Sequence, residues 1–550
     1  MTSTTAATAI ASTTITFVST MAVSTLVLTT GVRKAALGLL LLLAAPSQAP
    51  ASFSTLAATL SGPANGGQFG QSVSISGDGT RLAIGAHLVN SQGQVSVYAF
   101  SGNSWNALGA ALSGESNGDM FGYKVALSYD GTRLVVSAPK GDGAGGVNTG
   151  HIRVYEYDGS SWVQFGDDID GTEVDALFGW KLAIQRNGRR VVVGNYAHDG
   201  GLAESGLVTV FEVDTTGVSP KWEQTGNANG GGSTQMARGY FGSSVAITED
   251  GTRIAAGALH TNSYRGSVRM LHQPVSPSSD WTEVGDIMFG TGTGGGSNGV
   301  RCGFETALSA DGTVMTSSCS YGASKYGQVR VYEYAGGVWS QRGDFIDGDG
   351  YLDFAIYHSL SDGGELMLIG SPLYGSDNAG KARLFQYDSA TGWTNIADTV
   401  AQTASGQFGT SVSMSGDGTV LVVGAPGIGS LPGQVYTYAS GVVDSSSCRT
   451  LPPPPPEPPV APSSPLAPAA GFPTCSSSCS AAAAEPETRT CMAFGDPHYA
   501  NFARQVFDFF GRGLFEHARF DISSCGCEVV VQALLAKLTK GKVRTRASGP

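Results

Sequence analysis

The chain has 550 residues, of which 78 are glycine and only 14% are charged. This length accommodates several domains or one large repeat fold, and so few charged side chains favour strands and turns over helices, whose solvent faces are rich in Lys, Glu and Arg. The net charge of −12 argues against a nucleic-acid partner, because phosphate binding depends on clustered Lys and Arg.

Residues 1–49 have the features of a secretory signal peptide. Arg33-Lys34 precedes an apolar run that extends to Ala45, which is too short to span a bilayer but suits the h-region of a signal. We expect cleavage after Ala49, and a start at Met21 would give a signal of ordinary length. The mature protein is therefore expected to be secreted and extracellular.

Two alternatives to a cleaved signal stay open. An uncleaved anchor built from residues 9–32 would hold the protein at the cell surface, and only in that case do we expect a membrane to be involved. The other alternative is a targeting peptide for an organelle.

Residues 50–445 are dominated by internal repetition. Seven copies of one unit follow one another, with spacings from 52 residues (Phe69 to Phe121) to 63 residues (Phe178 to Phe241). Each copy begins with a Phe-Gly pair or a degenerate equivalent. These pairs are Phe69-Gly70, Phe121-Gly122, Phe178-Gly179, Phe241-Gly242, Cys302-Gly303, Phe354-Ala355 and Phe408-Gly409.

Each copy is predicted to form four short strands. In the first copy, apolar runs at 73–76 and 82–84 flank Asp78-Gly79, for which we expect a two-residue type I′ turn. A third strand follows at 95–100, and Trp105 marks the fourth. The apolar runs are nearly continuous, as is typical of strands covered by neighbouring sheets on both faces. Seven such units predict an all-β fold, a seven-bladed β-propeller of four-stranded antiparallel blades.

The two ends of the repeat region are predicted to share a blade. The seventh copy ends near Tyr438 without a Trp strand, whereas residues 53–62 align with residues 105–114 of the first copy. We therefore expect 53–60 to form the outer strand of the last blade, which would also cover an exposed sheet edge.

The units resemble the FG-GAP repeats of integrin α-chain propellers. Besides the Phe-Gly pairs, the matching tripeptide is Gly424-Ala425-Pro426, with near matches at Ser137-Ala138-Pro139 and Gly370-Ser371-Pro372. The resemblance covers roughly residues 53–444. It implies a propeller of the kind found in extracellular binding and adhesion proteins.

Integrin-type repeats often carry calcium loops between the first and second strands. Here those turns are too short to surround a calcium ion, which takes six to eight oxygen ligands. The calcium candidate is the set Asp347, Asp349 and Asp353, which precedes a first strand and has Phe345 at the first ligand position. The competing interpretation is a solvated acidic loop, and no other cofactor is expected.

Cys302 and Cys319 flank the Asp311-Gly312 turn of the fifth unit. Counting back from that turn places them nearly opposite each other, which predicts a disulfide, with two buried free thiols as the alternative. The sequence does not pair the other six cysteines. These are Cys448, Cys475, Cys479, Cys491, Cys525 and Cys527.

A Pro/Ser/Ala-rich linker at 446–489 is predicted to be a stiff polyproline spacer. Residues 490–550 follow, with the string Cys491-x-x-x-Gly-Asp-Pro-His-Tyr-x-x-Phe502 and then Phe507-Asp-Phe-x-Gly511. This string resembles the opening of a von Willebrand factor type D domain and implies a partial, cysteine-bearing β module. The family's Asp-Gly is replaced by Ala503-Arg504, which puts its calcium site in doubt.

The sequence favours a binding protein over an enzyme. No nucleophile elbow, His-Glu-x-x-His motif or nucleotide loop is present. We expect an extracellular or cell-surface binding or adhesion protein that presents a loop face to a protein or glycan. The alternative is a secreted, glycosidase-like hydrolase. For a glycosidase, the candidate acids are Asp167, Asp168, Asp170 and Asp175. The candidate metal ligands, which stand in equivalent loops, are His87, His198 and His260.

Overall fold

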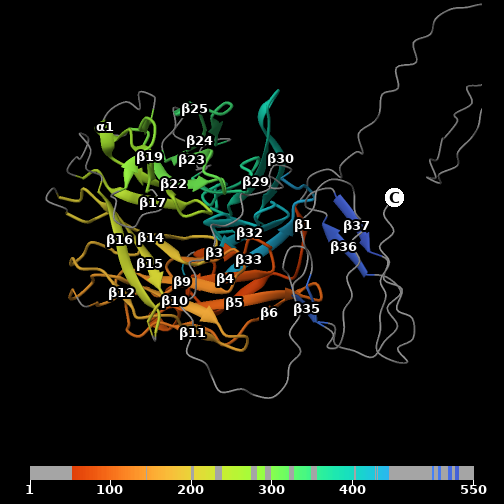
Figure 1. Ribbon diagram of the computed structural model, residues 1–550. Helices are drawn as coiled ribbons and strands as arrows, with labels where there is room; N and C mark the ends of the chain where they lie inside the picture. The colour runs from red at the N-terminus through yellow and green to blue at the C-terminus, as the bar shows by residue number, and fades with distance from the viewer. Residues whose placement is uncertain are drawn as a thin grey trace, which may run out of the picture. The chain divides into compact units, whose positions relative to one another are not determined.

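The computed structural model describes residues 53–444, except 144, 200–202, 218, 230–237, 274–280, 291–298, 321–326, 349–355, 402–403, 428 and 430, together with the backbone of four strands between 498 and 531 (Figure 1). The predicted signal, the alternative anchor and the linker lie outside the described residues. Among the described residues, no helix has the length and apolar character that a membrane span requires.

Seven antiparallel sheets form the blades of the propeller. The first strands of the blades are β3 (Ser72–Ile75), β8 (Val125–Leu127), β13 (Lys181–Ile184), β17 (Phe241–Ile247), β22 (Cys302–Leu308), β27 (Tyr357–Leu360) and β31 (Ser411–Met414). Each first strand contacts the next, and β31 contacts β3, so the ring closes with these strands around its axis. The predicted seven-bladed all-β fold is confirmed.

The second and third strands form the middle of each blade. The second strands are almost wholly buried, because neighbouring blades cover both of their faces. They are β4 (Arg81–Ala86), β9 (Arg133–Ala138), β14 (Arg190–Asn195), β18 (Arg253–Ala258), β23 (Val314–Cys319), β28 (Leu366–Ser371) and β32 (Val420–Ala425). The third strands are β5 (Gln94–Ser101), β10 (His151–Tyr157), β15 (Leu207–Asp214), β19 (Ser267–His272), β24 (Gln328–Ala335), β29 (Lys381–Asp388) and β33 (Pro432–Ala439).

The fourth, outer strand is continuous in blades 3 and 6, where a bulge keeps it paired with the third strand along its length. These strands are β16 (Lys221–Asn229) and β30 (Gly392–Val400). In the other blades it is split into two pieces that pair with the same third strand. The pieces are β6 (Ser104–Ala107) and β7 (Leu112–Ser113), β11 (Trp162–Gln164) and β12 (Ile169–Asp170), β20 (Thr282–Glu283) and β21 (Met288–Phe289), β25 (Val338–Gln341) and β26 (Ile346–Asp347), and β1 (Ser54–Thr55) and β2 (Leu60–Asn65).

The predicted closure of the ring by its two ends is confirmed. Both β1 and β2 pair with β33, Ser54 opposite Ala439 and Leu60 opposite Val435. The ring of Phe53 packs edge-on against Tyr438, with centroids 5.2 Å apart. The start of the propeller sequence therefore completes the blade that its end begins.

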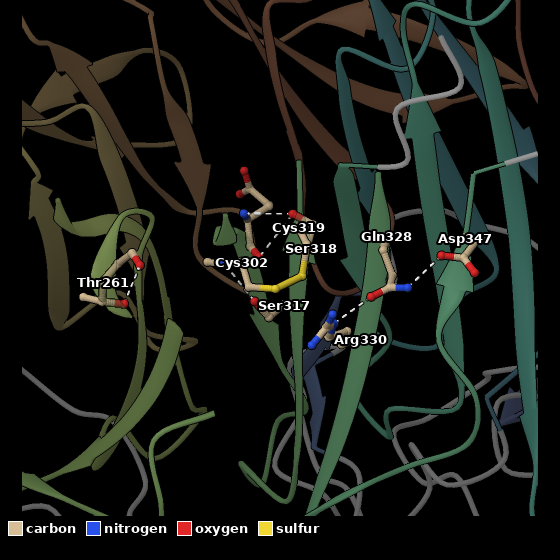
Figure 2. The surroundings of a disulfide bond; sticks show 11 residues. Thr261, Cys302, Ser317, Ser318, Cys319, Gln328, Arg330 and Asp347 are labelled. Atoms are coloured by element: carbon tan, nitrogen blue, oxygen red, sulfur yellow. Dashed lines mark hydrogen bonds between the residues drawn. A yellow bond between two sulfur atoms is a disulfide. The ribbon is translucent and has the colours of Figure 1, made fainter. Parts of the chain in front are cut away.

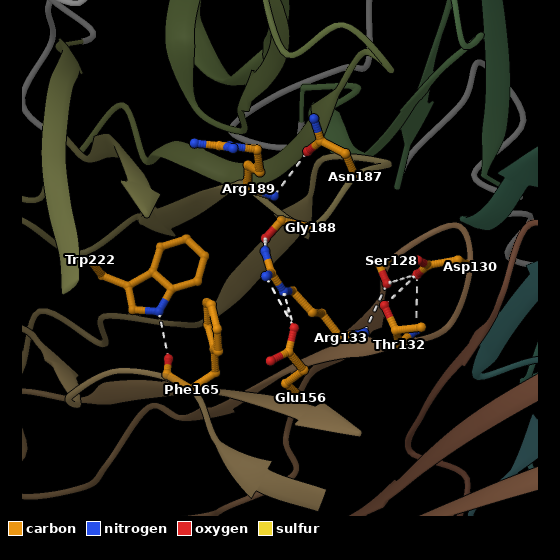
Figure 3. A network of polar contacts seen from close by, with 10 residues as sticks. All are labelled: Ser128, Asp130, Thr132, Arg133, Glu156, Phe165, Asn187, Gly188, Arg189 and Trp222. Atoms are coloured by element: carbon orange, nitrogen blue, oxygen red, sulfur yellow. Dashed lines mark hydrogen bonds and ion pairs between the residues drawn. The ribbon is translucent and has the colours of Figure 1, made fainter. Parts of the chain in front are cut away.

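The type I′ turn expected at the Asp-Gly pairs is wrong. Only the glycine takes a positive φ, +72° at Gly79, and the loop spans four residues between Ser76 and Arg81. The Asp78 carboxylate accepts hydrogen bonds from the Ser76 hydroxyl at 2.5 Å and the Thr80 amide at 3.0 Å. Asp is present because its side chain organises the loop from within, as its equivalent Asp130 does with Ser128 and Thr132 (Figure 3).

Neighbouring blades are joined through the repeated aromatic residues. The Phe of each Phe-Gly pair is buried, and its carbonyl lies so close to the preceding blade that a Cβ at Gly93 would stand 2.0 Å from the Phe121 oxygen. In four blades the indole N–H of the fourth-strand Trp donates to a carbonyl of the preceding blade, as Trp222 does to Phe165 at 2.9 Å (Figure 3). The repeat motif thus encodes contacts between blades as well as strands within them.

Cys302 and Cys319 form a disulfide directly across β22 and β23, where their Cα atoms are register partners (Figure 2). Cys302 occupies the position that Phe occupies in the other units, and both cysteines pack with Val300 in a small buried cluster. A covalent link therefore stands where a large aromatic side chain stands elsewhere.

Replacing both cysteines by Ala is expected to lower the free energy of unfolding by about 3 kcal/mol, because the disulfide closes a loop between positions 17 residues apart. Urea titration with and without reductant measures this. The double variant serves as its own control, since reductant should not change its stability. Peptide mapping that finds both thiols free in the native chain would contradict the prediction.

Two short helical turns, η1 (Val89–Ser91) and α1 (Thr261–Tyr264), lie in loops that follow second strands. Beyond the propeller, β34 (His498–Ala500) pairs with β35 (Val506–Asp508), and β36 (Ala518–Ile522) pairs with β37 (Cys527–Val531), all antiparallel. These hairpins agree with the expected β character of residues 490–550.

Candidate binding site

One end of every blade gathers two kinds of loop. The first and second strands are antiparallel, with Ser72 opposite Gly85, so the residues that lead into the first strand lie beside those that follow the second. His87 follows β4 and Tyr123 precedes β8. Residues of both kinds therefore meet on one face of the propeller, around the axis.

A continuous row of aromatic rings crosses this face from blade 1 to blade 4, and we call it the aromatic arc. Its closest pair is Tyr123 and Trp180, whose ring centroids are 4.5 Å apart. Successive centroids elsewhere along the row are 4.6–5.6 Å apart. The arc consists of His87, Tyr123, Trp180, Tyr196, Tyr240, His260 and Tyr264.

The arc is partly open to solvent and carries polar groups along its edge. Tyr264, at its end, is 40% exposed, and the rings between His87 and Tyr264 are partly buried. The Tyr240 hydroxyl donates to the Glu204 carboxylate at 2.9 Å, and Arg238 lies 3.3 Å from the same carboxylate. Burial, followed by this contact with Glu204, raises the pKa of Tyr240 to about 12. The hydroxyl therefore remains a donor at neutral pH.

A second set of side chains lies beside the arc, and we call it the axial ring. Each member is the fourth residue of its repeat unit, counted from the first residue of the Phe-Gly pair or its equivalent. Three of its members are serines that hydrogen-bond backbone groups of a neighbouring blade. The other four carry ionisable groups. The axial ring consists of Ser72, Lys124, Lys181, Ser244, Glu305, Tyr357 and Ser411.

The ionisable members of the axial ring meet over the axis. Lys181 of blade 3 forms an ion pair with Glu305 of blade 5, reaching past the small Ser244 of blade 4. Lys124 of blade 2 is also within electrostatic range of both Lys181 and Glu305. The ion pair between blades that are not neighbours places these side chains around the centre of the ring.

Lys124 is the unpaired cation of this group. Its side chain forms no hydrogen bond or ion pair with the described residues, whereas Lys181 is neutralised by Glu305. Burial, and then the positive charge of Lys181, lower the pKa of Lys124 to about 8. Burial opposes the charge of Glu305, but Lys181 and Lys124 outweigh it and lower the pKa of that carboxyl. The cluster thus carries one excess positive charge at neutral pH.

The far end of the axis is filled by a different charged cluster. Arg186 lies 3.1 Å from the Glu249 carboxylate, 3.0 Å from that of Asp362, and over the ring of Tyr129. Arg186 stands five positions after Lys181, which corresponds to roughly 16 Å along an extended chain. The axial ring and the Arg186 cluster therefore lie at opposite ends of the axis, with the axial ring at the end that carries the arc.

The calcium candidate is only partly within the described residues. Asp347 lies in β26 and accepts a hydrogen bond from the Gln328 amide at 2.7 Å, while Arg330 donates to Gln328 (Figure 2). Asp349 and Asp353 lie outside the described residues, so calcium binding there stays a prediction. Among the described residues, no group of three or more His, Cys, Asp or Glu side chains is arranged for a metal ion.

The histidines and acids weighed from the sequence have other surroundings. His87 and His260 pack on Tyr123 and Tyr240 within the arc. Asp168 accepts two hydrogen bonds from Arg153, at 2.8 and 2.7 Å. Burial opposes ionisation of Asp168, but Arg153 lowers its pKa overall, which suits a structural anion better than a general acid.

Two comparisons with known proteins find no match. A search against protein-family models finds no match, and no curated protein matches the sequence. The sequence analysis also missed the arc and the axial ring. The sequence does carry a sign of both at the third and fourth positions of the repeat units. There Tyr123-Lys124 and Trp180-Lys181 replace the Gln71-Ser72 of the first copy.

Proposed function

We propose that this chain is an extracellular binding protein with an FG-GAP-type propeller, followed by the opening of a von Willebrand factor type D domain, and that its aromatic arc binds an extended glycan. The unbroken row of rings, partly exposed from Tyr123 in blade 2 to Tyr264 in blade 4, carries this proposal. The Phe-Gly and Gly-Ala-Pro motifs and the seven blades support the FG-GAP assignment, and the signal-like N-terminus supports secretion.

A glycan fits the arc better than a protein surface does. A sugar ring has an apolar face and a rim of hydroxyls, and Tyr, Trp and His likewise combine an apolar body with a polar edge. The rings stand in single file with centroids about one ring width apart, which suits a linear chain of sugars. Donors and acceptors such as Glu204 and Arg238 line the same edge.

Replacing Trp180 by Ala is expected to weaken glycan binding at least about 10-fold, or roughly 1.4 kcal/mol, because the ring in the middle of the row is lost. A glycan array probed with the full-length chain identifies ligands, and calorimetry measures the affinities. Tyr157→Ala is the matched control, since Tyr157 is also partly buried but packs on Trp162 outside the arc.

Two results would contradict the proposal. One is an array without any glycan ligand. The other is an equal loss of binding in the Trp180 and Tyr157 variants, which would indicate general destabilisation. Thermal melts of both variants separate loss of binding from loss of folding.

A further inference from the structure

The axial ring and the arc are adjacent in sequence and in space. Lys124 directly follows Tyr123, and Lys181 directly follows Trp180, so each lysine is attached to a residue of the closest ring pair in the arc. We therefore expect an anionic group that a ligand stacked on these two rings extends toward the axis to reach Lys124.

The positive charge of the axial ring comes from a few named side chains. Three charged groups meet there, Lys124, Lys181 and Glu305, and one ion pair among them leaves a single positive charge. The chain as a whole carries −12, so this excess cation is not part of a general basic surface. Tyr123 and Tyr357 add hydroxyl donors, because burial raises the pKa of both groups and keeps them protonated.

A purely structural lysine would be expected to have a partner. Burying a cation without one is unfavourable, and most buried charges are paired. Lys124 instead lies partly buried near a second lysine, and among the described residues Glu305 favours its protonated form less strongly than burial and Lys181 oppose it. The serines at equivalent positions show that a small neutral side chain satisfies the fold.

We propose that Lys124 binds the anionic group of an acidic glycan, a carboxylate or a sulfate ester, while the sugar rings stack on the aromatic arc. This inference rests on the proposed function and adds the chemical class of the ligand. The ion pair of Lys181 with Glu305 positions the second lysine and limits the site to one extra negative charge. The axial ring therefore selects acidic over neutral sugars.

The test compares three probes with the full-length chain: a hexamer of galacturonic acid, the same hexamer with its carboxyl groups reduced, and a sulfated dextran hexamer. At pH 7 an acidic hexamer should bind at least about 10-fold more tightly than the reduced one. Lys124→Met should abolish this difference, and Lys140→Met, which changes an exposed lysine of the same blade, should preserve it. The stronger of the two acidic probes identifies the anion.

The difference in affinity between the acidic and the reduced hexamers should also shrink between pH 7 and pH 9, because Lys124 loses its proton near pH 8. The groups facing it are Lys181, Glu305, Tyr123 and Tyr357. The lowered pKa of Glu305 and the raised pKa values of Tyr123 and Tyr357 keep the charge states of these three groups constant across that range. A pH-independent difference would point to another cation and overturn the assignment to Lys124.

The remaining outcomes separate the two proposals. Equal affinity for acidic and reduced hexamers, with both weakened by Trp180→Ala, would overturn the anion site and leave the glycan arc standing. A Lys124-dependent preference that Trp180→Ala does not alter would leave the anion site standing without the arc. Binding of none of the three hexamers would overturn both.

Discussion

A chain that begins at Pro63 is expected to lose the stability of the whole propeller, not of one blade. Such a chain lacks β1 and the start of β2, which supply the outer strand of the seventh blade. It also loses the Phe53 ring from Tyr438 and the hydrogen bond from the Leu56 amide to Thr437, 2.9 Å long. Truncating one packed Phe alone typically costs about 3 kcal/mol or more.

The loss is global because the seventh blade contacts blades 1 and 6 through β31, with β3 on one side and β27 on the other. In the closed ring, an unstable seventh blade opens both interfaces at once. Thermal unfolding of the truncated chain should therefore show one transition at a lower temperature. A chain that begins at Pro50 is the control, because it lacks the predicted signal peptide but keeps β1.

Joining the two ends of the propeller covalently should raise its stability. Ser54 and Ala439 are register partners across the closure, so Ser54→Cys combined with Ala439→Cys would join the two ends covalently and raise the melting temperature under oxidising conditions. A truncated chain that melts like the control, or a cross-linked chain that gains nothing in oxidant, would show that the closure contributes little stability.

The sequence predicted the propeller well because its signals are repeated and local. Phe-Gly pairs and Trp strands recur in register, and the unpaired segment at 53–62 could be assigned by alignment with a complete copy. The turn type was missed because Asp-Gly suits several turns, and only the backbone shows that Gly79 alone has positive φ. In that case the Asp side chain, not its backbone conformation, is the reason for the residue.

The aromatic arc was harder to predict, because its members occupy different kinds of position. Trp180 leads into a first strand, Tyr196 follows a second strand, and Tyr240 precedes a Phe-Gly pair. Their spacing in the sequence has no regular period, so no periodicity analysis groups them. They meet only because the closed ring brings neighbouring blades to one face, and the pairing of Lys181 with Glu305 across blade 4 depends on the same geometry.

Arg186→Met is expected to destabilise the propeller by about 3 kcal/mol at pH 7, because it leaves two carboxylates without their shared cation. Arg186 of blade 3 pairs with Glu249 of blade 4 and with Asp362 of blade 6, and it covers Tyr129 of blade 2, with its guanidinium carbon 3.1 Å from the ring centroid. One side chain thus joins four blades at the end of the axis.

The side chain of Arg186 matters more because the backbone hydrogen bonds between blades are interrupted at this residue. Residues just past the first strands form a circle of hydrogen bonds from one blade to the next, 2.8–3.0 Å long, as from the Tyr129 amide to the Arg186 carbonyl. In this circle, no backbone hydrogen bond joins the described residues Arg186 and Glu249. The side-chain ion pair connects blades 3 and 4 at this point instead.

The cost of Arg186→Met should depend on pH in a defined direction. Burial raises the pKa of both Glu249 and Asp362, and the charge of Arg186 counteracts that rise. Without Arg186, both folded-state pKa values should lie further above their unfolded-state values. Between those values the folded state binds more protons than the unfolded state, so the stability of the variant falls as pH rises.

Urea titrations at pH 4.5 and pH 7 test this prediction directly. The loss of unfolding free energy in Arg186→Met relative to the native chain should be smaller at the lower pH, where a larger fraction of the two carboxyl groups is protonated. Adding Glu249→Gln and Asp362→Asn should recover much of the loss at pH 7, since no unpaired charge then remains. Arg189→Met is the matched control, because Arg189 is exposed three residues away (Figure 3). Equal effects of the two Arg variants, or a deficit that does not change with pH, would show that the charge cluster does not stabilise the ring.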